Sequence, residues 1–158
     1  MANFRKSNVK LNLRNAKNSD LKITYRIKSK SIKPYVEKIW GWNESCQRDM
    51  HESNFIASDT KLIVYKKQEI GYVVLKETDK EILIENLLIE KEFQNLGIGK
   101  EVMAQIIERA HLEKKLIRLH VFKINIKAQR FYGNLGFAKT SEKENHIEMK
   151  KNWLPYRV

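Results

Sequence analysis

The chain of 158 residues is long enough for one domain with a single sizeable core. Its 42% hydrophobic and 32% charged residues form an ordinary balance for a soluble globular protein. A single cysteine excludes an internal disulfide, and no set of Cys and His has the spacing of a zinc site, so we expect no metal. Because no apolar run is long enough to span a membrane and the N-terminus lacks the apolar core of a signal peptide, we expect a cytoplasmic protein with no membrane partner.

The net charge of +12 has two interpretations. A strongly basic surface attracts polyanions such as nucleic acid or an anionic membrane. The Lys and Arg residues are, however, spread along the chain and interleaved with Glu, as in KEFQNLGIGKE, and no block of five or six like charges occurs. We therefore favour lysine as an ordinary surface residue here and expect no nucleic-acid partner.

Residues 9–16 alternate between polar and apolar side chains, which predicts a strand, and the NSD that follows is typical of a helix cap. The region from 20 to 56 has a helical pattern with interruptions. Pro34 is placed to open a new helical stretch, because proline is tolerated in the first turn of a helix, and Gly41 is placed to break it. We therefore expect two helices after the first strand.

Three runs rich in strand-forming residues come next. KLIVYKK and EIGYVVLKE are separated by a short polar turn, which predicts a hairpin, and residues 81–90 form a third run long enough to be central in a sheet. From 98 to 110 the apolar residues recur at helical spacing. Residues 116–121 again read as a strand.

The last part of the chain predicts a short helix and a hairpin. In NIKAQRFYGNLGF, Asn125 stands at the expected N-cap and Gly136 at the expected C-cap, and two strands around the polar turn EKEN close the chain. The predicted order is strand, two helices, three strands, helix, strand, helix, two strands. This order indicates an α+β or mixed α/β fold with one parallel crossover around the long helix. We expect a single domain over residues 1–158, with its core at about 9–151.

The stretch QNLGIGK follows a strand and opens the long helix. It is not a dinucleotide fingerprint, because Val102 stands where a third glycine is needed, and it is not a P-loop, because Glu101 follows the lysine. Backbone amides at the positive end of a helix can hold an anion, and Gly97 and Gly99 leave room for its approach. The alternative is that the glycines only ease a tight turn. The first interpretation predicts a pyrophosphate bound by the main chain without magnesium, at Gln94, Asn95, Leu96, Gly97, Ile98, Gly99 and Lys100.

A second motif downstream completes a pattern that resembles the GNAT superfamily of acyl-CoA-dependent N-acyltransferases. The superfamily carries [QR]-x-x-G-x-[GA] at the start of the long helix and, later, N-x-x-A-x-x-x-Y followed by x-x-x-G-F. The resemblance covers the order of elements over residues 9–151 and implies a central mixed sheet of about seven strands flanked by helices, with splayed central strands that hold acetyl-CoA. The matching residues are Gln94, Gly97, Gly99, Asn125, Ala128, Tyr132, Gly136 and Phe137.

The resemblance also implies how the cofactor is bound. The pantetheine arm would lie between residues 81–90 and 116–121, where backbone groups of Leu87, Leu88 and Ile89 pair with it as if it were another strand. Asn125 would contact the arm through its side chain, although capping its own helix is an equally good use. Ala128 would leave room for the cofactor, although alanine is also simply a good helix former.

Transfer of an acetyl group to an amine requires a group that collects the ammonium proton and a group that protonates the leaving thiolate. Glu85 lies where some members of the superfamily have a catalytic glutamate. It is our candidate base, either directly or through a water; the alternative is a solvent-facing strand residue paired with a lysine. Tyr132 matches the family's general acid, and the alternative is a core residue. A main-chain amide near Leu87 or Leu88 would meet the oxyanion if the strand carries a bulge.

In this superfamily the acceptor is selected largely by the segment between the first two strands. Here Trp40 and Trp42 stand on either side of Gly41, and Glu44 and Gln47 follow. The stretch is similar to one in a subset of bacterial members. Trp42, Glu44 and Gln47 are our candidates for an aromatic and acidic wall that binds a cationic amine; the alternative is that the tryptophans pack a helix onto the sheet. A carboxylate at Glu44 would favour a polyamine, aminoglycoside-like or lysine-like acceptor.

The resemblance therefore implies an N-acetyltransferase that moves an acetyl group from acetyl-CoA to a primary amine of a small molecule by direct attack in a ternary complex. The alternative acceptor is a protein lysine or N-terminus. A hypothesis of another class is a non-catalytic acyl-CoA-binding sensor. Homodimers are common among such folds, and the sequence leaves that state open.

Overall fold

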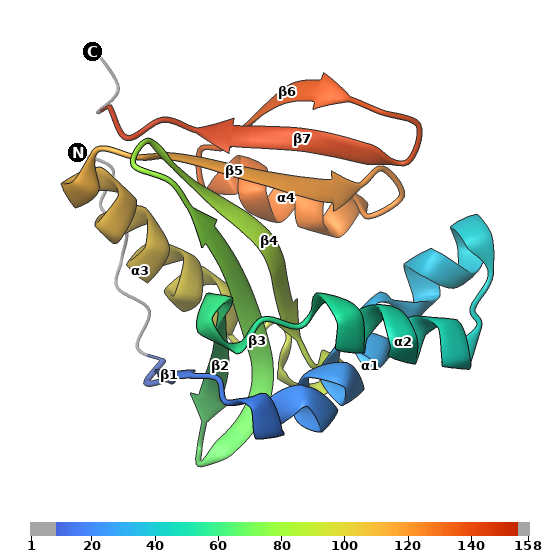
Figure 1. Ribbon diagram of the computed structural model, residues 1–158. Coiled ribbons are helices and arrows are strands. Elements are labelled where there is room, and N and C mark those ends of the chain that lie inside the picture. Colours follow the sequence, from blue (N-terminus) through green and yellow to red (C-terminus); the bar gives the residue numbers. More distant parts are fainter. Residues whose placement is uncertain (1–8, 155–158) are drawn as a thin grey trace.

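The computed structural model describes residues 9–154. The ends of the expected domain, residues 1–8 and 155–158, lie outside the described part, and with them much of the N-terminal segment considered for a signal peptide. The described residues form a seven-stranded mixed sheet with helices on both faces, in the strand order β1-β2-β3-β4-β5-β7-β6 (Figure 1). The fold class and the order of elements predicted from the sequence are confirmed.

The strands and helices follow one another in the predicted order, with three short 3₁₀ turns between them. The strands are β1 (Asn12–Asn15), β2 (Thr60–Tyr65), β3 (Gln68–Glu77), β4 (Glu81–Ile89), β5 (Leu116–Phe122), β6 (Ala138–Glu142) and β7 (His146–Lys151). The helices are α1 (Leu21–Trp40), α2 (Glu44–Asn54), α3 (Ile98–Glu113) and α4 (Ile126–Asn134), and the 3₁₀ turns are η1 (Asn18–Asp20), η2 (Ala57–Asp59) and η3 (Lys91–Phe93).

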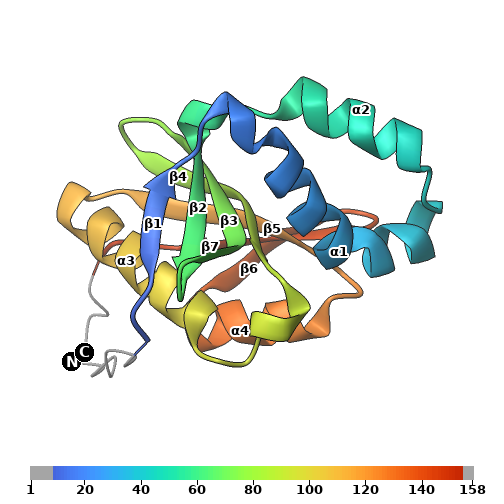
Figure 2. The same ribbon diagram turned by 90° about the horizontal axis from the view of Figure 1, so that it is seen from below.

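The two faces of the sheet are covered unequally. Helices α3 and α4 lie on one face, and α1 with α2 lies on the other (Figure 2). Within the described part of the chain, 19 buried residues form one cluster between the sheet and the α3–α4 layer. Under α1 the buried cluster consists of Ile27, Leu62 and Tyr72. The larger core therefore supports the side of the sheet on which the glycine-rich stretch lies.

Helix α1 corrects one expectation. Pro34 does not open a new helix, because it lies inside α1, which continues to Trp40. Proline removes one backbone hydrogen bond and crowds the preceding turn, and a helix accommodates this by bending, as α1 does in Figure 2. Buried residues on both sides of the proline, Ile27 and Val36, hold the helix against the sheet. Gly41 ends the helix as predicted, with φ +79° and its N–H donated to the carbonyl of Glu37.

The segments next to the sheet edge follow local rules with two differences. Strand β1 is shorter than the predicted run at 9–16. Asp20 directly precedes α1, but its carboxylate accepts hydrogen bonds from Arg14 and from the Lys17 N–H rather than from the helix amides. The predicted hairpin of β2 and β3 is confirmed, and its tight turn is formed by Lys66 and Lys67, both at positive φ.

Candidate active site

Strands β4 and β5 run in parallel and then part. They pair only from Glu81 to Ile84 on β4, opposite 116–119 on β5, although β4 continues for five more residues to Ile89. On the other side of β4, Leu75 pairs with Ile84 and Val74 pairs with Asn86, so Glu85 is an extra, bulged residue. A bulge increases the local twist and bends the strand, which gives a physical reason for the separation that begins at this point. The predicted splay is confirmed.

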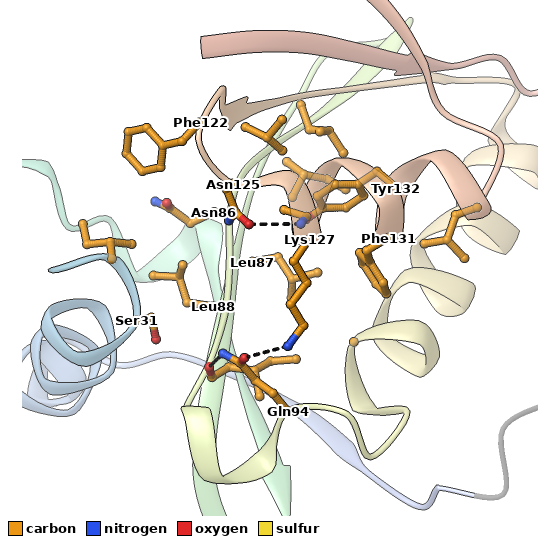
Figure 3. A pocket seen from close by; sticks show the side chains of 18 of the residues that line it. Ser31, Asn86, Leu87, Leu88, Gln94, Phe122, Asn125, Lys127, Phe131 and Tyr132 are labelled. Carbon is orange, nitrogen blue, oxygen red and sulfur yellow. Dashed lines mark hydrogen bonds between the residues drawn. The ribbon is translucent and has the colours of Figure 1, made fainter. Parts of the chain in front are cut away.

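The separated strands open into a cleft of about 960 Å³. This volume is at the upper end of the range for small-molecule sites. Its walls come from β4, β5, the start of α3, α4, the middle of α1 and the first residue of β7 (Figure 3). The sequence-predicted residues that line it are Glu85, Leu87, Leu88, Ile89, Gln94, Asn95, Gly97, Ile98, Gly99, Lys100, Asn125, Ala128 and Tyr132.

Of the three β4 residues proposed to pair with the pantetheine arm, two direct backbone groups into the gap and one faces β3. The N–H of Glu90 donates to Ile70 on the β3 side. Because backbone groups alternate in direction along a strand, those of Leu88 also face β3, whereas those of Leu87 and Ile89 face the gap left by β5. The Ile89 carbonyl already accepts a hydrogen bond from the Gln94 side chain at 2.9 Å. The N–H and the carbonyl of Leu87 are therefore both directed into the gap. Of the Ile89 groups, the N–H is the one that Gln94 does not use.

The glycine-rich stretch forms an exposed helix start. Gly97 is the N-cap of α3 at φ +82°, Asn95 has φ +61°, and no side chain caps the helix. The first intrahelical bond runs from the N–H of Glu101 to the carbonyl of Gly97 at 3.1 Å. The amides before Glu101 have no intrahelical acceptor, and they lie at the positive end of the helix dipole. This arrangement fits a phosphate group. Leu96, 49% exposed, does not line the cleft.

Gly99 has a second use besides leaving room for an anion. A Cβ at this position would lie 3.3 Å from the Phe131 ring on α4 and 3.4 Å from the side chain of Ile89. Such contacts are tighter than usual packing. The glycine therefore lets α3 approach α4 closely, and the packing reason and the anion-binding reason coexist at this position.

A lysine that carried no sequence motif lies at the same end of the cleft. Lys127, in the first turn of α4, directs its ammonium to Gln94 Oε1 at 3.5 Å (Figure 3). Gln94 in turn joins the loop to the end of β4. Lys127 and Lys100 thus add positive charge beside the free amides of α3. The signal in the sequence was weak, because lysine is common throughout the chain.

Asn125 and Ala128 are explained in part by the helix itself. The Asn125 side chain caps α4 by accepting a hydrogen bond from the Ala128 N–H at 3.0 Å. Both residues line the cleft, and Ala128 also packs against the larger core. The helix-capping alternative for Asn125 is thus realised, while its amide nitrogen is not used by that bond.

Tyr132 lies on α4 among aromatic neighbours and also lines the cleft. Its ring contacts Phe131 at 5.0 Å and Phe137 at 5.6 Å between centroids, both edge to face. Burial raises the pKa of its phenol, so the hydroxyl remains protonated at neutral pH. A protonated hydroxyl in a cleft is suited to donate a proton, and the same burial fits a core role.

Glu85 lies at the bulge and lines the cleft. Its carboxylate pairs with the Lys76 ammonium at 3.3 Å, and both side chains are more than 40% exposed. Burial lowers the pKa of Lys28, and the charge of Glu85 opposes that shift. The lysine-paired alternative is therefore present in the structure, while Glu85 still reaches the cleft as a base would need to.

Trp42, Glu44 and Gln47 are placed at the corner between α1 and α2, and none of them is among the described residues that line the cleft. Glu44 accepts hydrogen bonds from the Tyr25 hydroxyl at 2.7 Å and the Trp42 indole N–H at 2.8 Å, and it pairs with Arg48 at 3.2 Å. These contacts with Trp42 and Tyr25 lower the pKa of the carboxyl. The structure gives Glu44 a packing role at this corner, and substrate binding there stays a prediction.

Tyr35, Phe122 and His146, which the sequence did not indicate, line the cleft, and Trp40, which the sequence did indicate, packs beside them. Tyr35 of α1 stacks on Phe122 at 5.8 Å, and Phe122 lies 4.8 Å from the His146 ring. Trp40 contacts Phe122 at 6.1 Å and His146 at 6.2 Å. We name Tyr35, Trp40, Phe122 and His146 the aromatic wall. These residues come from three distant parts of the chain, so no local motif could reveal that they lie together.

Ser31, one turn before Tyr35 on α1, also lines the cleft. Its hydroxyl oxygen is buried and has no hydrogen-bond partner within the described residues.

Between residues 9 and 154, no cluster of three or more His, Cys, Asp or Glu is arranged to hold a metal ion. The helices of the same part include none that is long and apolar enough to cross a membrane.

Solved structures with this fold include proteins described as N-acetyltransferases. PaiA N-acetyltransferase from Thermoplasma acidophilum, in complex with coenzyme A, matches with a TM-score of 0.74 and 17% identity over 91% of this chain and 99% of that one. The ribosomal-protein-S18-alanine N-acetyltransferase from Escherichia coli matches with a TM-score of 0.71 and 15% identity over 94% and 99%. Arabidopsis thaliana Naa50, in complex with the bisubstrate analogue CoA-Ac-MVNAL, matches with a TM-score of 0.65 and 18% identity over 92% and 99%.

The parted strands and the uncapped α3 start lie on a fold that this chain shares with these proteins. The model of the acetyltransferase (GNAT) family matches residues 23–137, from α1 to the end of the second motif. The chain therefore belongs to the GNAT acetyltransferase family.

Proposed function

We propose that this enzyme transfers an acetyl group from acetyl-CoA to the primary amine of a small molecule by direct attack in a ternary complex. The observation that carries the proposal is the cleft between β4 and β5, which joins the free amides of α3 at one end to Glu85 and Tyr132. When bound, acetyl-CoA supplies an activated thioester. We propose further that the enzyme acts in the cytoplasm.

The cofactor is held mainly by the backbone in this proposal. The carbonyl of Leu87 and the N–H of Ile89 extend the sheet toward the pantetheine amides. The amides of residues 95–100 bind the pyrophosphate, and Lys100 and Lys127 add charge. The residues present fit this group, because Gly97 leaves the α3 start uncapped and no acidic side chain lines that end.

The chain's own groups then handle the protons. Glu85 collects a proton from the acceptor ammonium, directly or through a water, so that the amine lone pair can form the new N–C bond. The Leu87 N–H, two residues after the bulge, donates to the carbonyl oxygen as its negative charge develops. As the C–S bond breaks, the Tyr132 hydroxyl donates its proton to the sulfur.

A small acceptor is favoured by the aromatic wall. Tyr35 and Trp40 contact Phe122 at the end of β5, and Trp40 also contacts His146 at the start of β7. In this proposal these rings bound the space for the acceptor, which favours a small one. The matched structures include an enzyme described as acting on a ribosomal-protein alanine and one bound to a peptide-like analogue, and these descriptions apply to those proteins. A protein acceptor is the competing outcome of the test.

The test combines cofactor binding with turnover. Calorimetry with coenzyme A and a thiol-release assay with acetyl-CoA over a panel of primary amines are expected to show binding and amine-dependent release. Tight cofactor binding without turnover on any amine would indicate the sensor hypothesis. Acetylation of cellular proteins, detected by mass spectrometry, with no small amine turned over would replace the small-molecule proposal by the protein-directed one.

A further inference from the structure

The acceptor side of the cleft is poor in negative charge. Among the described residues that line the cleft, Glu85 is the one carboxylate, and it is paired with Lys76 at 3.3 Å. The nearby carboxylate of Glu148 faces His120 at 3.5 Å and Arg118 at 3.7 Å and does not line the cleft. A polyamine carries several ammonium groups, and each group removed from water needs a partner charge. The cleft offers one.

The same side is rich in flat rings. Tyr35, Phe122 and His146 line the cleft, and Phe122 contacts both of the other rings. Burial lowers the pKa of His146, and its electrostatic interactions with His120 and Lys143 act in the same direction. Its imidazole is therefore predominantly neutral at pH 7 and adds an aromatic face rather than a charge.

Glu44, the residue that would have favoured a polyamine, is not in the cleft. Its carboxylate is taken up by Tyr25, Trp42 and Arg48 at the α1–α2 corner. The charge argument for a polycationic acceptor therefore does not apply to this site.

We propose that the acceptor is a monoamine in which a short chain carries the amino group on an aromatic ring, with the ring against the aromatic wall and the amino group toward Glu85. This inference rests on the proposed acetyl transfer and names its substrate class. One carboxylate matches one ammonium, and the rings of Tyr35, Phe122 and His146 match an aromatic body. Phenethylamine is the simplest probe of this class.

The experiment compares phenethylamine, hexylamine and spermidine with the full chain and acetyl-CoA. We expect kcat/KM for phenethylamine to exceed the values for the other two amines by about tenfold, as expected for a pocket shaped to one body. Phe122→Leu keeps apolar volume and removes the ring face. We expect it to lower kcat/KM for phenethylamine about 2- to 10-fold and to lower the value for hexylamine less, so that the ratio of the two falls.

Trp153→Leu serves as the matched control, because Trp153 follows the opposite end of β7 and contacts Lys114. It should leave the ratio of the amines unchanged. A higher kcat/KM for spermidine, or an unaltered ratio in Phe122→Leu, would overturn the aromatic-amine inference while leaving acetyl transfer intact.

Binding is measured separately, by saturation-transfer NMR of phenethylamine and spermidine with the cofactor-free protein. Binding of phenethylamine that is weakened by Phe122→Leu, without turnover of any amine, would support the aromatic site and overturn the proposed transfer. If phenethylamine is neither bound nor turned over, this inference is overturned. Coenzyme A calorimetry then tests the transfer hypothesis on its own.

Discussion

The cofactor end of the cleft lies between β4, the start of α3 and α4, against the larger buried cluster, whereas the acceptor end lies beside α1, where the cluster is Ile27, Leu62 and Tyr72. At the first end the proposed binding groups are mainly backbone amides, positioned by a helix start. At the second end they are side chains of the aromatic wall, brought from α1, β5 and β7. Figure 3 shows Gln94 and Lys127 at one end and Phe122 at the other.

The difference indicates which end tolerates change. Backbone groups keep their positions through many side-chain substitutions, so the cofactor end depends on a few glycines and on the core behind them. The acceptor end depends on the identity of each ring and on the seating of α1. We therefore expect substitutions at the two ends to separate cofactor affinity from acceptor selection, and the following predictions test this from the largest effect to the smallest.

Tyr132→Phe tests the chemistry where the two ends meet. If the hydroxyl protonates the leaving thiolate, kcat falls about 100-fold or more, because a positioned acid contributes at least that much. The ring contacts with Phe131 and Phe137 remain, so coenzyme A affinity and thermal stability stay unchanged. Stopped-assay kinetics and calorimetry measure both quantities. An unchanged kcat would leave Tyr132 as a core residue only.

Gly71→Ala tests β4, the strand that lines the cleft along both ends. Gly71 lies on the neighbouring strand β3. An added Cβ would lie 2.3 Å from the carbonyl oxygen of Leu88, a backbone atom that cannot move alone. We expect a loss of about 3 kcal/mol in the free energy of unfolding, together with weaker cofactor binding and a higher acceptor KM, because β4 must shift. Gly133→Ala is the control, since a Cβ added at Gly133 would point into open space. Urea denaturation that shows equal stability for both variants would contradict this.

Gly97→Ala and Gly41→Ala compare the two ends directly. Both glycines have positive φ, +82° and +79°, and one opens α3 while the other ends α1. Each alanine is expected to cost about 1–3 kcal/mol of stability through backbone strain. Only Gly97→Ala should raise the Kd of coenzyme A, by about tenfold, or about 1.4 kcal/mol. Equal affinities of the two variants in calorimetry would remove the α3 start from the cofactor site.

The seating of α1 and α2 is expected to depend on pH through His51. Its Nε2 lies 2.9 Å from the Thr24 hydroxyl, and burial lowers its pKa from 6.5 to about 4. The unfolded chain therefore binds a proton below pH 6.5 that the folded chain resists, so stability is full above pH 6.5 and falls as the pH decreases toward 4. We expect the His51 contribution to be about 1–3 kcal/mol at pH 4.

Urea denaturation of the wild type and of His51→Gln between pH 7 and pH 4 measures this effect. The glutamine can still hydrogen-bond to Thr24 but does not titrate. The variant should lose less stability than the wild type over this interval, while cofactor affinity at pH 7 stays the same. Parallel stability curves for the two proteins would assign the acid sensitivity to other groups.

Sequence-based predictions succeeded where the structure depends on neighbouring residues and failed where it depends on packing between distant segments. The helix end at Gly41, the cap at Asn125 and the glycines of the α3 start were predictable, because each depends on the φ angle or on a hydrogen bond within a few residues. The prediction for Pro34 is wrong, because packing of α1 on the sheet outweighs the local preference of proline for a helix start. The placement of Glu85 at a bulge was also beyond a local rule, since it depends on the register of β3.

The sequence by itself determined the order of elements, the family and the glycine start of α3, because hydrophobic periodicity and glycine positions are properties of neighbouring residues. Only the tertiary structure decided what surrounds the proposed acceptor site. In the fold, Glu44 packs at the corner between α1 and α2, and Tyr35, Phe122 and His146 lie together. Contacts between residues so far apart in the chain depend on how the sheet twists and where α1 crosses it, and no local pattern records either.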